Sequence, residues 1–459
     1  MTAPWRPSCA ILELGPDFYD PVVAADFPET RLRFRNDAAA REIGLDGLSD
    51  DDWVRHFGRF EPLPGSLEEP LALRYHGHQF RSYNPEIGDG RGFLFAQALD
   101  GRGRLLDLGS KGSGQTPHSR FGDGRLTLKG GVRELLATSM LQALGADTSR
   151  TFSLIETGEE LVRGDEPSPT RSAVLVRLSH SHIRYGSFQR VAARQDADDM
   201  ARLVGYVIGN YFGVSGESYS ALIDHAVTNA ATQAAQMMAA GFVHGVLNTD
   251  NINITGEIFD YGPFRFAPAW DEAFTAAYFD HQGLYAFGRQ PDAMQWNVYQ
   301  LALALRLVAP TEVLRGPLEA FPARYEAALT RAMLMRLGVR AMGDARDVAL
   351  VEALVAGLQA TQMPLDRFWF DWRGGARRGT SEADATYALP AFAPFVAQVA
   401  AYAPSVSTGH PYWSDPAPCG LPIAEVEALW APIAERDDWE PLNAKLAAIA
   451  RLGAAMADA

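Results

Sequence analysis

The sequence has little of what disulfide-stabilised, secreted or membrane-spanning proteins need. It has only two cysteines in 459 residues, Cys9 and Cys419, which lie far apart and in no metal-type pair. This excludes a disulfide framework and a cysteine-based metal site. No apolar run is long enough to span a membrane, and the first residues lack the basic start and apolar core of a secretory signal. We therefore expect a cytoplasmic location and no membrane partner.

Positive charge is scarce as well. The chain has 41 Lys and Arg residues against 56 Asp and Glu residues, a formal net charge of −15. This balance argues against nucleic acid as a partner. Apolar residues make up 47% and charged residues 21%, which is typical of a globular protein with a sizeable core. A nucleotide polyphosphate would need a local cluster of Arg, Lys and metal.

Residues 244–262, HGVLNTDNINITGEIFDYG, gather several oxygen ligands in a short span. The alternating pattern in 252–259 predicts a β-hairpin that turns at Thr-Gly-Glu. A hairpin of this length brings its ends together, so Asn251 and Asp260 could reach one ion. Mg²⁺ suits such a site, because it usually takes few protein ligands and completes its shell with water and phosphate. The alternative is that the two residues merely flank a tight turn.

The same residues fit part of the protein-kinase pattern, H-R-D-x-x-x-x-N followed by D-F-G. His244 takes the place of the first histidine, Asn251 that of the metal-binding asparagine and Asp260 that of the second metal ligand. The catalytic aspartate of the pattern falls on Val246, which cannot accept a proton. Asp250 is the nearest carboxylate that could replace it.

Two glycine-rich loops precede this segment. Residues 87–91, Ile-Gly-Asp-Gly-Arg, lead into a predicted strand pair whose return strand ends at Lys111. The glycine spacing fits neither the dinucleotide fingerprint nor the P-loop, and a hairpin corner is the alternative. Backbone N–H groups in such a turn, together with Arg91, can hold a phosphate. The second loop, 112–125, repeats Asp-Gly-Arg at 123–125, so the two loops predict a nucleotide cradle.

A helix is predicted at 129–144, with Glu134 in its early turns. In protein kinases a strand lysine pairs with a glutamate on the following helix, which fixes the lysine on the phosphates. Lys111 and Glu134 follow one another in that order. The alternative for Glu134 is a solvated helix face.

Residues 151–190 are predicted to form further strands, which carry Arg177 and Arg184. Strand-flanking arginines are usually surface charge, but they can also bind a polyphosphate through two nitrogens at once. Long helical patterns follow at 196–213 and 217–240. The chain therefore changes from a strand-rich half to a helix-rich half, which indicates an α+β protein.

Taken together, these motifs resemble the selenoprotein O family of pseudokinase-fold protein adenylyltransferases. The matching stretches span about residues 70 to 305 and include RYHGHQF, IGDGR, SKGSGQTPHSRFGDGR, VRLSHSHIRYGSF, HGVLNTDN, FDYGPF, DHQGLYAFGRQP and QWNVYQLALAL. The resemblance implies a bilobal, kinase-like α+β fold with a strand-rich N-lobe and a helical C-lobe. The expected parts are an N-terminal extension (1–80), the N-lobe (81–190), the C-lobe (191–345) and a helical C-terminal extension (346–459).

The resemblance also implies an activity and a set of site residues. ATP would lie in reverse orientation, and its AMP moiety would pass to Ser, Thr or Tyr hydroxyls of protein substrates, releasing pyrophosphate. Asp250 would accept the proton, Asn251 and Asp260 would hold Mg²⁺, with Mn²⁺ as the alternative metal, and Glu134 would support Lys111. The residues expected to contact ATP are Gly88, Gly90, Arg91, Lys111, Asp123, Gly124, Arg177, Arg184 and Asp260.

The chain departs from the family pattern at its C-terminal end. Many members carry a cysteine or selenocysteine close to the C-terminus, whereas this sequence ends RLGAAMADA. That difference speaks against redox control through a terminal thiol. Three rival functions remain: a kinase-like phosphotransferase, which Val246 counts against, a catalytically dead nucleotide-binding scaffold, and a structural helical protein.

Overall fold

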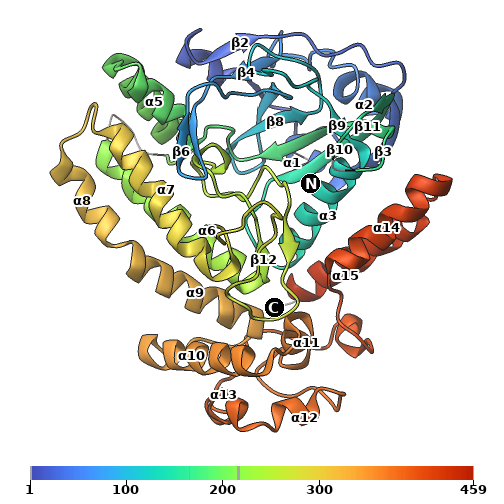
Figure 1. Ribbon diagram of the computed structural model, residues 1–459, viewed down its shortest axis with the longest axis vertical. Coiled ribbons are helices and arrows are strands. Elements are labelled where there is room, and N and C mark those ends of the chain that lie inside the picture. Colours follow the sequence, from blue (N-terminus) through green and yellow to red (C-terminus); the bar gives the residue numbers. More distant parts are fainter. Residues whose placement is uncertain (1–2, 165, 214–217, 458–459) are drawn as a thin grey trace.

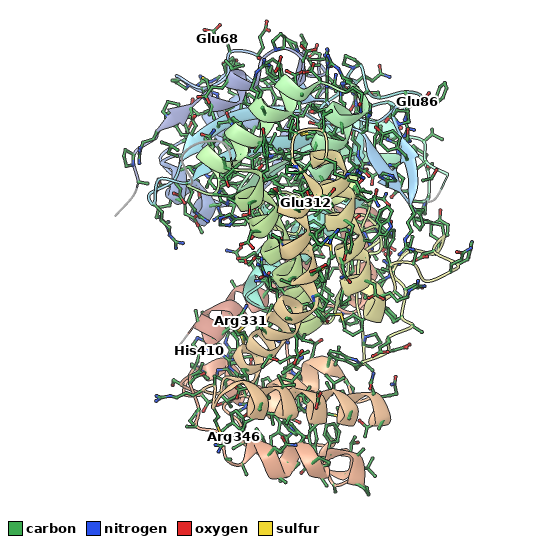
Figure 2. All side chains as sticks on the ribbon, turned by 90° about the vertical axis from the view of Figure 1, so that its left-hand side faces the viewer. Glu68, Glu86, Glu312, Arg331, Arg346 and His410 are labelled. Carbon is green, nitrogen blue, oxygen red and sulfur yellow. The ribbon has the colours of Figure 1, made fainter. Side chains whose placement is uncertain are left out.

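The computed structural model describes residues 3–164, 166–213 and 218–457, and it divides into a strand-rich part followed by a helix-rich part (Figure 1). Figure 2 shows the same division from the side: Glu68 and Glu86 lie at the strand-rich end and Arg346 towards the helical end. The predicted α+β class, with the strand-rich lobe first, is confirmed. Within the described ranges, none of the helices combines the length and apolarity that crossing a bilayer requires.

One nine-stranded antiparallel sheet forms the strand-rich part. Its strands follow the order β2-β4-β7-β8-β11-β10-β3, with β1 paired to β7 and β9 to β11. The strands are β1 (Pro7–Ser8), β2 (Tyr19–Pro21), β3 (Arg31–Arg35), β4 (Leu71–Leu73), β7 (Leu94–Leu99), β8 (Leu105–Lys111), β9 (Leu126–Thr127), β10 (Arg150–Leu161) and β11 (Thr170–Ser179). Two small pairs lie outside it: β5 (Gly77–Gln79) with β6 (Ser82–Asn84), and β12 (Phe242–Val243) with β13 (Arg265–Phe266).

Helices flank the sheet and make up most of the second half. They are α1 (Asp37–Ile43), α2 (Asp50–Phe57), α3 (Leu128–Ala143), α4 (Tyr185–Ala193), α5 (Ala197–Asn210), α6 (Tyr219–Ala240), α7 (Gln290–Leu305), α8 (Thr311–Glu319), α9 (Phe321–Leu337), α10 (Asp344–Thr361), α11 (Leu365–Asp371), α12 (Asp384–Tyr387), α13 (Ala393–Val399), α14 (Ile423–Arg436) and α15 (Glu440–Ala457). Helix α6 packs against α7, α8 and α9, and α14 and α15 return to contact α3 (Figure 1).

The large sheet is covered on both faces. Residues along a strand point alternately to opposite sides, and alternate residues of β11 belong to two different core clusters. On β11, Leu175 joins the core beneath α3. Its neighbours Val174 and Val176 join an aromatic cluster that includes Trp53 and Phe57 of α2. Lys111, the residue of β8 paired with Leu175, therefore faces α3, and its side chain reaches Glu134 on that helix.

The helices predicted at 129–144, 196–213 and 217–240 are confirmed as α3, α5 and α6, although residue 217 lies outside the described ranges. The further strands predicted in 151–190 are confirmed as β10 and β11, but the last residues of that range begin α4 instead. Arg184 ends the extended segment, and Ser187 closes the first turn of α4 by bonding back to the Arg184 backbone.

The predicted hairpin at 252–259 is wrong, although the segment does double back. A tight turn is closed by the Gly256 N–H bonding to the Asn253 carbonyl, but the two arms do not pair with each other. Asn253 bridges to Arg184, and the other arm bridges through Ile258 to Thr148. The strand-like alternation therefore reflects pairing with distant parts of the chain.

Candidate functional site

A cleft of about 730 Å³ lies where the glycine loops of the sheet meet the segment that follows α6. This volume falls within the usual range for small-molecule and cofactor sites. The structure brings every predicted site residue except Glu134 to its lining: Gly88, Gly90, Arg91, Lys111, Asp123, Gly124, Arg177, Arg184, Asp250, Asn251 and Asp260. Residues separated by more than 160 positions in the sequence therefore face one space.

Lys111, in this lining, forms a buried ion pair with Glu134, which lies outside it. The Lys111 Nζ lies 2.5 Å from Glu134 Oε2, and it also donates to the Tyr261 carbonyl at 3.3 Å. Burial lowers the pKa of Lys111, and the neighbouring Glu134 carboxylate opposes that shift. Only 2% of Glu134 is exposed, so the alternative of a solvated helix face is wrong. The strand lysine and helix glutamate have the arrangement used by protein kinases.

Glu134 lies outside the cleft lining, and its closest cation is Lys111, with Arg177 farther away at 3.9 Å. We therefore expect Lys111 and Glu134 to behave as a unit. Lys111→Ala, Glu134→Ala and the double variant should each lose the nucleotidyl transfer that the family resemblance implies by a similar factor, about 10²-fold, because residues that act together are strongly non-additive. Steady-state rates for the four proteins form the test, with Glu134→Gln as a control that keeps the side-chain volume. Losses that multiply in the double variant would show that the residues act separately.

Asp260 binds two buried arginines from different elements. Arg177, on β11, donates from Nη1 to Asp260 Oδ1 at 2.6 Å. Arg184, at the N-terminus of α4, donates to Oδ2 and also to the Asp250 carbonyl at 2.8 Å. Burial alone would raise the pKa of Asp260, but Arg177, Arg184 and Lys111 outweigh it and hold that pKa well below its usual range. Asp260 is therefore ionised at neutral pH.

A second layer of side chains orients Arg177, and sequence reasoning missed it. Arg177 Nε donates to His182 Nε2 at 3.2 Å, so the ring carries its proton on Nδ1, 3.2 Å from the Ser179 hydroxyl. The His182 backbone N–H donates to Asp107 at 2.8 Å. Burial lowers the pKa of His182, which keeps the ring neutral and able to accept from the guanidinium. The motif Ser-His-Ser-His at 179–182 was the only feature of the sequence that could have indicated these residues behind Arg177.

Asp250 is buried at the edge of the cleft, in a short 3₁₀ turn (Thr249–Asn251). Its Oδ2 accepts from Gln79 Nε2 at 3.3 Å, whereas its Oδ1 has no hydrogen-bond partner among the described residues. Burial raises the pKa of Asp250 to about 6. A carboxylate with a free, desolvated oxygen and a pKa near neutrality is suited to accept a proton.

The hairpin β5–β6 approaches Asp250 closely, which the sequence did not predict. A Cβ atom at Gly77 would lie 2.7 Å from Asp250 Oδ1, so only glycine fits there without displacing the carboxylate. The backbone N–H of His78 donates to the Thr249 hydroxyl at 2.6 Å. This strand pair crosses the predicted boundary between the N-terminal extension (1–80) and the N-lobe (81–190), and it positions the candidate base.

The two glycine loops pack on each other to form one side of the cleft. A Cβ at Gly88 would lie 2.6 Å from the His118 ring, and one at Gly90 would lie 2.9 Å from the His118 carbonyl. Ser119 donates from its hydroxyl to the Gly90 carbonyl at 2.6 Å. Glycine is therefore required in the first loop so that the second can close over it.

The second loop adds charge to this side. Asp123 forms an ion pair with Arg163 at 2.8 Å. Arg163 also lines the cleft, and it was not predicted from the sequence. Gly124 has a φ of +71° and lies against Gly114, so no other residue fits easily. Arg91 and Arg120 also line the cleft. Among the described residues, neither forms an ion pair with a carboxylate of the cleft. These two guanidinium groups are available to an anion.

The residues present fit a Mg²⁺ ion. In the described ranges, no three His, Cys, Asp or Glu side chains form a metal-binding group, so a metal would depend on few protein ligands. The Asn251 amide nitrogen donates to the Val246 carbonyl at 3.0 Å, which leaves the amide oxygen free. The ionised Asp260 has further lone pairs beside those its arginines use. One carboxylate and one carbonyl-type oxygen, completed by phosphate and water, suit Mg²⁺.

The family model and the relatives that this chain matches all carry names that refer to nucleotidyl or adenylyl transfer. The family model described as "Protein adenylyltransferase SelO" matches residues 5–391. A protein from Gloeobacter violaceus named "Protein nucleotidyltransferase YdiU" is 45% identical over 449 residues, covering 94% of this chain and 92% of that protein. Proteins with the same name from Synechocystis sp. and Synechococcus elongatus are 49% and 41% identical, covering 75% and 97% of this chain and 74% and 94% of those proteins.

Among solved structures, the rhoptry antigen kinase domain of Toxoplasma gondii is similar with a TM-score of 0.27 and 13% sequence identity. That match covers 57% of this chain and 83% of the kinase-domain chain.

Proposed function

The chain belongs to the SelO family of protein adenylyltransferases, and from that premise we propose that it transfers AMP from ATP to Ser, Thr or Tyr hydroxyls of proteins. Its curated relatives are named nucleotidyltransferases, and nucleotidyl transfer is the activity it shares with them. Mg²⁺ as the metal and a cytoplasmic location are parts of the same proposal. One observation supports it: a cleft lined by Lys and Arg side chains and by a buried carboxylate, Asp250, in which Val246 stands where a kinase has its base.

In the proposed reaction, the hydroxyl oxygen of the protein substrate attacks the α-phosphorus of ATP. The bond from that phosphorus to the pyrophosphate oxygen breaks, and the hydroxyl proton passes to Asp250. Lys111, Arg177 and Arg184 bind the phosphate oxygens and offset the charge that develops on them, which is usually the largest catalytic contribution. Mg²⁺, held by Asn251 and Asp260, would supply further charge stabilisation when bound.

Intact-protein mass distinguishes this reaction from its rivals. Incubated with ATP and Mg²⁺, an accepted protein substrate should gain the mass of one adenylyl group, which is AMP less one water, with pyrophosphate released in equal amount. A gain of one phosphate would instead establish the phosphotransferase. Nucleotide binding with no change in mass of any protein, including the chain itself, would establish the inactive scaffold.

The pH dependence should report the ionisation of Asp250. Burial raises the pKa of Asp250 to about 6, and a base must be deprotonated to act, so kcat/KM should rise about tenfold per pH unit below 6 and level off above it. The hydrogen bond from Gln79 favours the ionised form, so Gln79→Ala should move the midpoint to higher pH. A pH–rate profile with the same midpoint in both proteins would assign the titration to another group.

A further inference from the structure

A row of aromatic rings leads from the candidate base to the protein surface. Its innermost ring, Tyr285, donates from its hydroxyl to Asn248 Oδ1 at 2.8 Å. The next residue, Phe80, donates its backbone N–H to the same oxygen at 3.0 Å. Asn248 lies two residues before Asp250, and Gln79, next to Phe80, bonds the Asp250 carboxylate. The row therefore begins close to the residue proposed to accept the proton, and Asn248 and Gln79 link the two.

The rings contact one another in sequence and become more exposed outwards. Ring centroids are 5.0 Å apart between Tyr285 and Phe80, 5.8 Å between Phe80 and Phe279, and 5.1 Å between Phe279 and Tyr278. The exposed fractions along the row are 3%, 38%, 42% and 80%. Exposed aromatic groups that adjoin one another mark interaction sites, and aromatic residues supply much of the binding energy of interfaces. We call these four residues the aromatic row.

Phe80 and Arg81 form the tip of the β5–β6 hairpin, and the hydrogen bonds of the hairpin fix their backbone. Phe80 and Arg81 have φ values of +49° and +64°, a conformation that costs free energy for side chains of this size. The bonds from the hairpin to Thr249, Asn248 and Asp250 maintain it. A surface held in one conformation before binding loses little entropy when a partner docks.

Arg81 gives this surface a charge. Its guanidinium lies 5.4 Å from the centre of the Trp296 ring, and no carboxylate of the described residues pairs with it. An arginine stacked on an aromatic ring, without an acidic partner, is ready to bind a carboxylate of another molecule.

The row is not part of the nucleotide cleft. Gln79 lines that cleft, but Phe80, Phe279 and Tyr278 do not. The cleft already supplies cations for the phosphates, whereas the row supplies apolar surface next to Gln79, the residue that bonds the Asp250 carboxylate. An occupant of the row would therefore lie close to Asp250 without filling the cleft.

We propose that the aromatic row and Arg81 dock the protein segment that carries the target hydroxyl. The occupant is an exposed loop or terminus with a large apolar side chain and a carboxylate close to that hydroxyl. The apolar side chain packs on Phe80, Phe279 and Tyr278, and the carboxylate binds Arg81. This inference rests on the proposed function, because Asp250 defines where the hydroxyl must lie.

The test measures binding without turnover. Three short synthetic peptides each carry one acceptor hydroxyl: the first has Phe and Glu beside it, the second has Ala for Phe, and the third has Lys for Glu. Their Kd values are measured by fluorescence anisotropy with Mg²⁺ and an ATP analogue whose α,β-bridging oxygen is replaced by a methylene group, which cannot donate AMP. The first peptide should bind about tenfold more tightly than either other, an effect typical of one good interface contact.

Variants assign the preference to its residues. Phe279→Ala should abolish the preference for Phe, and Arg81→Ala should abolish only the preference for Glu. Leu303→Ala on α7 is the matched control, because Leu303 is also an exposed apolar residue but lies in neither the cleft nor the row; it should change nothing. Folding is checked for each variant by thermal unfolding.

Three results would overturn the inference: equal or undetectable binding of the three peptides to the unchanged protein, a preference that survives in Phe279→Ala, or an increase in KM for ATP in that variant with peptide binding unchanged. AMP transfer to the first peptide is scored separately. Selective binding without transfer would refute the proposed function and leave the docking surface standing.

Discussion

Asp260→Asn is expected to reduce the proposed AMP transfer by about 10²–10³-fold while the protein stays folded, since it removes one charge from the centre of the site and little volume. The Asp260 carboxylate is the shared partner of Arg177 and Arg184 and the proposed metal ligand. Without its charge the two guanidinium groups repel one another and lose their fixed positions, and a metal loses its anionic ligand. Asp260→Ala should have the same effect on activity and should also destabilise the fold.

The loss of stability expected in Asp260→Ala follows from the burial of the two arginines that Asp260 binds. Arg177 is 4% exposed and Arg184 3%, so alanine at 260 leaves buried charges with fewer partners, a change that costs about 3–5 kcal/mol. Asp89 is the matched control, because its Oδ1 lies 3.3 Å from Arg184 Nη2 but it is not a proposed metal ligand. Asp89→Asn should lose less activity and keep its affinity for metal.

Metal binding should be measured directly as well as through activity. Mn²⁺ binding, followed by electron paramagnetic resonance with a non-hydrolysable ATP analogue, should weaken in Asp260→Asn and Asn251→Ala and persist in Asp89→Asn. If folded Asp260→Asn bound Mn²⁺ and transferred AMP at the normal rate, the role assigned to Asp260 would be wrong.

The sequence identified the cleft residues because each belongs to a short motif whose residue types are unusual together. The family resemblance inferred from those motifs is confirmed by the family match over residues 5–391. The pairing of Lys111 with Glu134 was correctly anticipated, since it depends only on the order of a strand and the helix after it. The roles of these residues in binding and catalysis stay predictions.

Residues that act through long-range contacts could not be found in the same way. Gln79 is 171 positions from Asp250, and nothing in its own motif points to that carboxylate. His182 lies behind Arg177 only because β11 turns back at Ser179, a feature of the fold. The hairpin error has the same origin: alternation predicts an extended backbone but not which distant segment it pairs with.

Val246 provides the sharpest distinction between AMP transfer and phosphoryl transfer. It lines the cleft, its carbonyl accepts from Asn251, and its aliphatic side chain cannot accept a proton. In the kinase orientation, a hydroxyl approaching the terminal phosphate would find no base there, and general-base assistance is typically worth about 10²–10⁴-fold. With ATP reversed, the α-phosphate would lie towards Asp250. Val246→Asp should therefore create no kinase activity, because the nucleotide would still be reversed.

The expected result is that label from the α-phosphate of ATP becomes attached to protein, label from the γ-phosphate does not, and pyrophosphate is released in step with modification. Asp250→Asn should reduce attachment of the α-label by about 10²–10⁴-fold without abolishing binding of ATP, since it removes the proton acceptor and leaves Lys111, Arg177 and Arg184 in place. Stable attachment of γ-label, or release of ADP in step with modification, would decide for the phosphotransferase. Gain of γ-transfer in Val246→Asp would show that the nucleotide also binds in the kinase orientation, because only in that orientation does residue 246 face the terminal phosphate.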